Sequence, residues 1–366
     1  YLREQQKQEQ LLAARELALL SASASGPVGL GAGGDPSGGA ASPIEGIEKL
    51  PPEWVPSTYA LPSDYALFVE EFRRIPNSTW IAKPTGKAQG RGIFLVSKLQ
   101  QLKKWSTASQ KAPGEESPFL EPYIISRYIN DPLLVGGKKF DMRLYVLVTN
   151  YRPLKVYLYK AGFCRFCVEQ YSDDVAEIDN IFVHLTNVAI QKHAEDYNEH
   201  HGGKWAILDL MLFIEGTHGK AASDKLAADM EAVIVHSLKA VQGCMINDKH
   251  CFEMYGFDIL IDQSLKPWLL EVNASPSLST TTEDDRLLKL RLINDTLNIA
   301  QQVKLNPSDG SDSPDPTYMG DFVCIFDEIV QRQRDEQRAS TAAGWRGSAG
   351  RRSTGNLSSG KSGFWR

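Results

Sequence analysis

The chain has 366 residues, 42% of them hydrophobic, so it can bury a sizeable core and form more than one subdomain. Its net charge of −5 argues against nucleic acid as a partner, and any acidic partner would have to meet local basic patches. Five cysteines are too few for a disulfide scaffold, which predicts a reducing compartment. Neither a membrane-spanning apolar run nor a signal-peptide pattern is found, so we expect a soluble, intracellular protein.

The first part of the chain is low in complexity. Residues 1–20 are rich in Gln, Glu and Leu and favour a helical or partly disordered leader, and residues 21–41 favour a flexible linker. The sequence begins without Met, which is consistent with a fragment. Leu61–Arg74 has apolar residues at helical spacing, with Ser63 and Asp64 as candidate caps, and predicts the first helix.

A glycine-rich loop follows at Lys83–Val96, KPTGKAQGRGIFLV. It lies between predicted strands Trp80–Lys83 and Gly92–Val96 and matches neither a Walker A loop nor a Rossmann fingerprint. Such a strand–loop–strand can form a flap over phosphates, because glycine leaves the backbone N–H groups unobstructed. Lys83 would then meet a nucleotide phosphate. The alternative is that the loop is only a turn.

Two further segments carry polar groups toward the middle of the chain. Ser126–Ile129 is predicted to be a short connection, and Lys139–Val148 (KFDMRLYVLV) is an alternating strand. One face of that strand carries Lys139, Asp141, Arg143 and Tyr145. A solvated face would explain these charges, but Lys and Arg flanking Asp also suit a polyphosphate site.

The next predicted elements are a hairpin and three helices. Tyr151–Val168 is expected to form a hairpin with Gly162 at its turn and Arg165 just beyond it. The Cys164/Cys167 pair in this hairpin has no second CxxC partner, so we expect no metal or redox role for it. The predicted helices are Ser223–Met245, Glu283–Ala300 and Asp321–Arg338.

The strongest chemical signal is at Tyr255–Ser277, YGFDILIDQSLKPWLLEVNASPS. It predicts strands Gly256–Asp262 and Pro267–Asn273 around a short turn. Symmetric pairing puts Asp258 opposite Glu271 and Ile259 opposite Leu270, with Asp258, Glu271 and Asn273 on one face. Facing carboxylates repel each other, and Mg²⁺ held by oxygen ligands would remove the repulsion. The alternative is that the acids face solvent or cap a neighbour.

Together these segments resemble the tubulin tyrosine ligase-like family, whose members are ATP-grasp ligases. The resemblance covers about Leu61–Ala300. It is carried by WIAKPTGKAQGRGIFL, ISRYINDPLLVGGKKFDMRLYVLV, YKAGFCRFC, HLTNVAIQKH, YGFDILID, PWLLEVNASPSLS and LINDTLNIA. HLTNVAIQKH and GFCRFC are most similar to the glutamylating branch, in particular the catalytic subunit of the tubulin polyglutamylase complex. The chain departs from the family in its shorter amino-terminal subdomain, Ile44–Ile81.

The resemblance implies an α+β ATP-grasp fold, with antiparallel sheets, flanking helices and the nucleotide between subdomains. The implied division is a disordered leader (1–43), a partial amino-terminal and central subdomain with the flap (44–120), a carboxy-terminal subdomain with the nucleotide, Mg²⁺ and amino-acid sites (121–305), a linker (306–320), a short helix (321–338) and a disordered basic tail (339–366).

The resemblance also implies residue roles. ATP phosphates would be held by Lys83 and covered by Gln89 and Gly90, and Arg143 would lie near the γ-phosphate. The adenine connector would be Ser126, Arg127, Tyr128 and Ile129, with Lys139 and Asp141 at base and ribose. Asp258, Glu271 and Asn273 would bind Mg²⁺, with Thr186 and Asn187 alongside. Arg165 and Lys289 would recognise the carboxylates of free glutamate.

The implied activity is ATP-dependent polyglutamylation. A glutamate side chain of a tubulin carboxy-terminal tail would be activated as an acyl phosphate and attacked by the amine of free L-glutamate, giving an isopeptide bond. The alternatives are tyrosine or glycine addition by the same family, a small-molecule ATP-grasp ligase, or a non-catalytic microtubule-binding subunit. The expected partners are tubulin, microtubules and other subunits of a polyglutamylase complex. The expected location is the cytoplasm and cytoskeleton, at a ciliary or flagellar axoneme or basal body.

Overall fold

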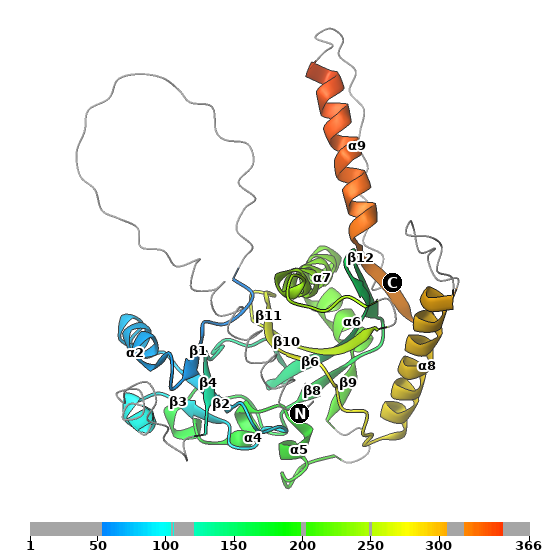
Figure 1. Cartoon of the computed structure of the whole chain (residues 1–366). Coiled ribbons are helices and arrows are strands. Elements are labelled where there is room, and N and C mark those ends of the chain that lie inside the picture. The colour runs from blue at the N-terminus through cyan, green and yellow to red at the C-terminus, as the bar shows by residue number, and fades with distance from the viewer. Residues whose placement is uncertain are drawn as a thin grey trace, which may run out of the picture. The chain divides into compact units, whose positions relative to one another are not determined.

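The computed structural model describes residues 53–103, 105, 121–198, 203–248, 251–305 and 318–346. They belong to two compact units, Tyr1–Ile129 and Asn130–Arg366. Each unit combines helices with antiparallel strands, so the predicted mixture of helices and antiparallel sheets is confirmed (Figure 1). The boundary lies at 129/130 rather than 120/121 because the strand at Tyr123–Arg127 pairs with two strands of the first unit.

The first unit contains a four-stranded antiparallel sheet in the order β1-β4-β2-β3. Its elements are β1 (Thr58–Leu61), α2 (Tyr65–Arg74), β2 (Trp80–Pro84), β3 (Phe94–Val96), the 3-10 helix η1 (Leu99–Leu102) and β4 (Tyr123–Arg127). Because β2 and β3 pair on either side of the glycine-rich loop, the predicted strand–loop–strand is confirmed. The expected connection at Ser126–Ile129 is wrong in part, since Ser126 and Arg127 lie in β4.

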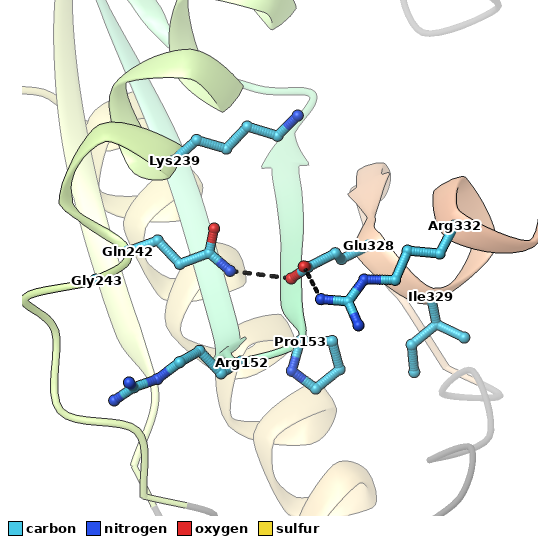
Figure 2. Close-up of a pocket in the computed structure, with 8 residues that line it drawn as sticks. All are labelled: Arg152, Pro153, Lys239, Gln242, Gly243, Glu328, Ile329 and Arg332. Atoms are coloured by element: carbon cyan, nitrogen blue, oxygen red, sulfur yellow. Dashed lines mark hydrogen bonds and ion pairs between the residues drawn. The ribbon is translucent and has the colours of Figure 1, made fainter. Parts of the chain in front are cut away.

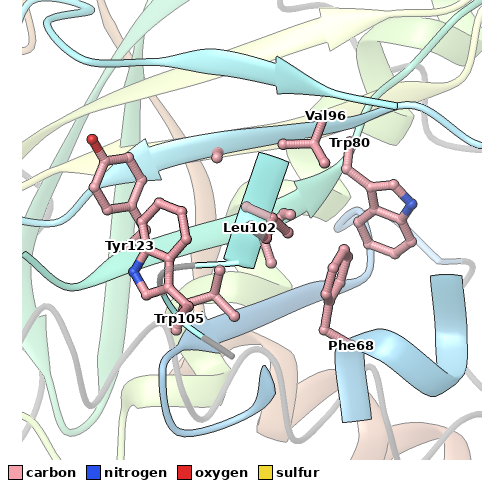
Figure 3. Close-up of a cluster of buried hydrophobic side chains, with 9 residues drawn as sticks. Phe68, Trp80, Val96, Leu102, Trp105 and Tyr123 are labelled. Carbon is pink, nitrogen blue, oxygen red and sulfur yellow. The ribbon is translucent and has the colours of Figure 1, made fainter. Parts of the chain in front are cut away.

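Aromatic packing holds α2 on this sheet (Figure 3). The predicted helix starts four residues later than Leu61, and its apolar stripe buries Phe68 against Trp80 with ring centroids 5.1 Å apart. Trp105 packs on Tyr123 at 5.0 Å in the same cluster. Asp64 is at the N-cap position, but its carboxylate accepts a hydrogen bond from the N–H of Ala60 instead of capping the helix.

The second unit is built around the long strand β6. Its strands are β5 (Leu134–Val135), β6 (Lys138–Tyr151), β7 (Leu154–Tyr159), β8 (Phe163–Phe166), β9 (Lys204–Ala206), β10 (Glu253–Ile261), β11 (Pro267–Asn273) and β12 (Phe322–Asp327). The main path of this antiparallel sheet is β11-β10-β6-β7-β12. β10 lies along one edge of β6, while β8 and β7 share the other edge. Figure 1 shows β10 beside β6.

The predicted Tyr151–Val168 hairpin is wrong, because both of its strands lie along the same edge of β6. β7 and β8 do not pair with each other but with different halves of β6. The chain between them can therefore carry β8 to the first half of β6, where Arg165 comes to lie opposite Asp141.

The helices of the second unit are η2 (Val175–Glu177), α4 (Ile181–His184), α5 (Val188–Gln191), α6 (Ile207–His218), α7 (Lys220–Val241), α8 (Glu283–Leu305) and α9 (Glu328–Arg346). α8 packs Leu292 and Ile299 against Tyr145, Leu147 and other side chains of the sheet. The helices predicted at Ser223–Met245 and Glu283–Ala300 are confirmed with shifted ends. Among the described helices, none combines the length and apolarity that crossing a membrane requires.

The carboxy-terminal prediction is wrong in two places. The expected helix over 321–338 begins with strand β12, whose alternating FVCIFD sequence pairs with β7. The expected disordered tail from residue 339 is helical up to Arg346, because α9 continues through it. The leader 1–43, the linker residues 306–317 and the tail residues 347–366 lie outside the described residues.

Candidate active site

The charged face of β6 is buried. Lys139, Asp141 and Arg143 expose 5%, 3% and 8% of their surface, and the next residue of that face, Tyr145, exposes none. A solvated strand face therefore does not explain these charges. Buried charges are expensive unless they are paired, so their partners define the site.

A buried ion-pair network joins β6 to its two neighbouring strands. Register places Arg165 of β8 opposite Asp141, and Asp258 of β10 opposite Arg143. Arg165 donates from Nε and Nη2 to Asp141 at 2.8 and 2.5 Å, and from Nη2 to Asp258 at 2.8 Å. Arg143 donates to both oxygens of Asp258, with Nη2 at 3.0 Å from Oδ2. The four side chains form one chain of alternating charge, Asp141–Arg165–Asp258–Arg143.

Charge pairing outweighs burial for Asp258 and Arg165. Burial raises the pKa of Asp258, but Arg165 and Arg143 hold that pKa well below its usual value. Burial lowers the pKa of Arg165, but Asp141 and Asp258 raise it well above normal. Asp258 and Arg165 are therefore both charged at neutral pH.

A glycine makes room for this arrangement. A Cβ added to Gly256 would lie 2.9 Å from Cβ of Pro276 and 3.1 Å from Cδ of Arg143. The missing side chain lets Arg143 lie across β10 toward Asp258.

The predicted pairing of the Asp258 and Glu271 strands is confirmed in its main register. Asp258 pairs with Glu271, and Gly256 pairs with Asn273. A bulge between Asp258 and Ile259 shifts the rest, so Ile259 pairs with Leu269 rather than with the predicted Leu270.

The donor chemistry of this hairpin fits Mg²⁺. Glu271 is exposed, and Asn273 donates from Nδ2 to Glu271 and to the carbonyl of Gly256, both at 3.2 Å. Asp258 and Glu271 face each other across the paired strands, and carboxylate oxygens are ligands that Mg²⁺ prefers. Asp258 could bind the metal ion once one of its oxygens releases a hydrogen bond from Arg143 or Arg165. In the part of the chain that the structure describes, no group of three His, Cys, Asp or Glu side chains is arranged as a metal site.

A second charged cluster lies beside Arg165 and was not predicted as a whole. Lys204 of β9 pairs in register with Arg165, and its Nζ donates to Asp285 at 2.9 Å and to Thr281 at 2.9 Å. Lys289 of α8 lies 3.0 Å from the other oxygen of Asp285 and donates to the carbonyl of Ser279. Burial lowers the pKa of Lys204, and Lys289 and Arg165 lower it further.

The signals for the missed residues differ. Asp285 was missed, although it lies four residues before the predicted Lys289 on one helix and the sequence displays that spacing. Lys204 follows a Gly- and His-rich loop, and nothing in the sequence indicates that β9 pairs with β8.

Tyr145 lies close to both clusters. Its pKa is raised to about 12 by burial, and it interacts electrostatically with Arg143, Asp285 and Asp258. Its hydroxyl has no hydrogen-bond partner among the described residues. A buried hydroxyl without a partner is rare, and a bound ligand is one way to satisfy it.

The residues predicted for the base and ribose lie farther along β6. Lys139 donates from Nζ to the carbonyl of His184 at 2.9 Å, and burial lowers the pKa of Lys139. The residue after His184, Leu185, is held by Gln191, whose Nε2 donates to the carbonyl of Leu185 at 2.5 Å. Thr186 and Asn187 come next in this segment, and Asn187 is the N-cap of α5 without a side-chain cap bond.

The predicted phosphate-binding residues of the first unit are on β2 and its loop. Lys83 is half-buried in β2, next to Ile124 of β4. Gln89 and Gly90 both have positive φ, 62° and 77°, which turns the loop sharply. Tyr123 anchors the end of the loop by donating to the carbonyl of Gly92 at 3.2 Å.

Ser126 and its neighbours are tied to the first unit. Ser126 Oγ lies 2.9 Å from Oγ1 of Thr58, and the N–H of Tyr128 donates to the carbonyl of Thr79. Arg127 is exposed, whereas Tyr128 and Ile129 are buried.

The buried charges of β6, β8 and β10 thus lie beside the hairpin that carries Glu271 and Asn273. Residues 41–309 match the model of the Tubulin-tyrosine ligase family, so the chain belongs to that family. The resemblance expected from the sequence is confirmed.

Three relatives illustrate the similarity. The protein named "Probable alpha-tubulin polyglutamylase Ttll1" from Tetrahymena thermophila is 51% identical over 284 residues, 77% of this chain and 69% of the relative. "Probable tubulin polyglutamylase ttll-9" from Caenorhabditis elegans is 49% identical over 67% of this chain. "Probable tubulin polyglutamylase TTLL9" from Bos taurus is 43% identical over 69% of this chain. The matched regions span 58% and 60% of the last two proteins.

Proposed function

We propose that the chain is an ATP-dependent ligase of the ATP-grasp fold that adds glutamate to glutamate side chains of tubulin carboxy-terminal tails. The observation that carries the proposal is the buried network of Asp141, Arg165, Asp258 and Arg143 beside Glu271 and Asn273. Relatives that carry the name tubulin polyglutamylase support the choice of glutamate and tubulin.

The nucleotide would be bound by separate charged side chains and backbone N–H groups rather than by a Walker loop. Lys83 and Arg143 would offset the phosphate charge, and the turn at Gln89 and Gly90 would cover the phosphates with backbone N–H groups. Lys139 and Asp141 would contact base and ribose, and Thr186 and Asn187 would extend that contact. The connector Ser126, Arg127, Tyr128 and Ile129 would meet adenine largely through its backbone.

Asp258, Glu271 and Asn273 would hold Mg²⁺, which supplies neutralisation of the phosphate charge during activation of the acceptor carboxyl. The protein groups around it perform two tasks. Arg143 and Arg165 lower the pKa of Asp258 and so keep that carboxyl ionised. They also add positive charge where the transferred phosphoryl group would be negative.

The incoming glutamate would be recognised by the second cluster. Free glutamate has one more carboxylate than glycine or tyrosine, and that carboxylate must be paired when it leaves water. Lys204 and Lys289 share one carboxylate, that of Asp285, and Arg165 lies beside Lys204 in register. Arg165 uses Nε and Nη2 for Asp141 and Asp258, and no hydrogen bond of its Nη1 is found within the described residues.

The proposed partners follow from the proposed substrate. Tubulin tails are acidic, so local cations on the surface would have to attract them although the whole chain is acidic. We further propose that the protein works on the cytoskeleton, at the axoneme or basal body of a cilium or flagellum, together with other subunits of a polyglutamylase complex.

The proposal is tested by incubating the full chain with tubulin, Mg–ATP and one amino acid at a time, followed by mass spectrometry of the tail peptides. We expect addition of glutamate and not of glycine or tyrosine. Addition of either of the other amino acids in place of glutamate would overturn the assignment of the Arg165 and Lys289 cluster.

A further inference from the structure

A basic cleft lies in the second unit, away from the charged cluster just described. It has a volume of about 570 Å³ and is lined by Arg152, Pro153, Lys239, Gln242, Gly243, Glu328, Ile329 and Arg332 (Figure 2). Arg152 directly follows β6 and lies nine residues beyond Arg143. At about 3.3 Å per strand residue this separation is roughly 30 Å, so the cleft is distinct from the candidate active site.

Among the described residues that line the cleft, Glu328 supplies the one carboxylate, and both of its oxygens already accept hydrogen bonds. One oxygen of Glu328 accepts from the N–H of Leu154 at 2.6 Å and from Gln242 at 2.9 Å, and the other accepts from Arg332 at 2.5 Å. Glu328 thereby ties the first turn of α9 to the β6–β7 turn and to the end of α7. Burial raises the pKa of Glu328, but these hydrogen bonds outweigh burial and lower it.

The cations of the cleft are less completely neutralised. Arg152 donates to a neutral group, the carbonyl of Met245, at 3.1 Å. Lys239 places its ammonium 4.4 Å from the ring centroid of Phe326. Within the described residues neither Arg152 nor Lys239 pairs with a carboxylate, and both are exposed. With Arg332 and Glu328 included, the lining carries a formal charge of +2.

Gln242 gives the cleft a fixed hydrogen-bond acceptor. Its Nε2 donates both hydrogens, to the carbonyl of Tyr151 at 2.8 Å and to Glu328 at 2.9 Å. The orientation of the amide is therefore set, and Oε1 remains as an acceptor. Figure 2 shows Lys239 on one side of the Gln242–Glu328 hydrogen bond and Arg152 on the other.

We propose that this cleft binds an acidic, extended peptide segment of a partner protein. Carboxylates of the peptide pair with Arg152 and Lys239, and a peptide N–H donates to Oε1 of Gln242. The fixed acceptor favours a peptide over a simple anion or a nucleic-acid backbone, because phosphates carry no N–H donor. Pro153 and Ile329 add apolar surface for the stems of glutamate side chains. The inference does not depend on the proposed ligase reaction.

The test measures binding of a dye-labelled peptide of alternating glutamate and glycine to the full chain by fluorescence anisotropy, without ATP. The variant is Arg152→Glu with Lys239→Glu. The control is Lys220→Glu with Lys225→Glu, which makes the same change of net charge on α7 away from the cleft. We expect the dissociation constant to rise about tenfold in the cleft variant at low salt, and much less in the control.

Three results would overturn the proposal: equal binding by wild type and cleft variant, equal binding of a matched glutamine peptide, or equal competition by an oligonucleotide of the same charge. The thermal midpoint of each variant shows whether it is folded. If the glutamate variant does not fold, Arg152→Gln with Lys239→Gln removes the same two charges without reversing them. That pair must then weaken peptide binding, and unchanged binding would overturn the proposal.

Discussion

Asp141 is the group whose neutralisation should most clearly reveal what the buried network contributes to stability. It exposes 3% of its surface and accepts two hydrogen bonds from Arg165, at 2.8 and 2.5 Å. Asp141→Asn keeps the shape but removes the charge and turns an N–H toward the guanidinium. Loss of one partner of a buried ion pair costs about 3–5 kcal/mol. Because Arg165 still donates to Asp258, we expect the lower end, about 3 kcal/mol.

Thermal and urea unfolding followed by circular dichroism measure this loss. For a unit of this size, about 3 kcal/mol lowers the melting temperature by roughly 6–12 °C. Asp173→Asn, on the exposed Asp173, is the matched control and should change the free energy of unfolding by less than about 0.5 kcal/mol. Replacing both partners, Asp141→Leu with Arg165→Met, should cost less than Asp141→Asn alone. If Asp141→Asn unfolds like wild type, the pairing seen here contributes no stability and the reasoning is wrong.

Three further predictions concern pH, a hydroxyl and a turn. The pKa of Asp258 is lowered in the folded state, so its contribution to stability is present above about pH 4 and is lost as the pH falls further. Below about pH 4 the melting temperature should therefore drop in wild type and drop less in Asp258→Asn. Parallel profiles of melting temperature against pH would contradict the prediction. Tyr145→Phe removes a hydroxyl without a partner among the described residues, so the free energy of unfolding should stay equal or rise by about 1 kcal/mol, while a fall in ligase rate would show that a ligand uses the hydroxyl. Gly320→Ala places a Cβ 2.2 Å from Cγ of Asp295 at a positive φ and should destabilise the protein by at least about 2 kcal/mol. The control, Gly216→Ala, lies in open space on a helix and should stabilise the protein by about 0.5–1 kcal/mol in the same unfolding assay. Equal effects of the two substitutions would refute the clash.

The local parts of the site could be predicted from the sequence because they depend on alternation and short turns. Side chains alternate along a strand, so Lys139, Asp141 and Arg143 had to share a face, and a short turn fixed Asp258 opposite Glu271. The bulge after Asp258 depends on packing that alternation does not describe, and the Ile259 pairing was therefore wrong.

The long-range parts could not be predicted. Nothing local to Gly162 indicates that β7 and β8 pair with different halves of β6, so the ion pair between Arg165 and Asp141 was not expected. The same limit hid the Lys204–Asp285 contact, which joins residues 81 positions apart. At the carboxy-terminal end, β12 was predicted as helix although its FVCIFD sequence is rich in residues that favour strands, so the local signal was present and was misinterpreted.

The central claim, that this site ligates glutamate, is tested most directly by the rate at which the full chain incorporates radiolabelled glutamate into tubulin with Mg–ATP, compared with Glu271→Gln. Glu271 is exposed and supplies one of the proposed metal ligands, so its substitution should leave the melting temperature within a few degrees of wild type. The account predicts incorporation by the wild-type chain and its loss in Glu271→Gln over the whole range of Mg²⁺ concentrations. Equal rates for the two proteins, or no incorporation of glutamate by a wild-type chain that transfers another amino acid, would contradict it.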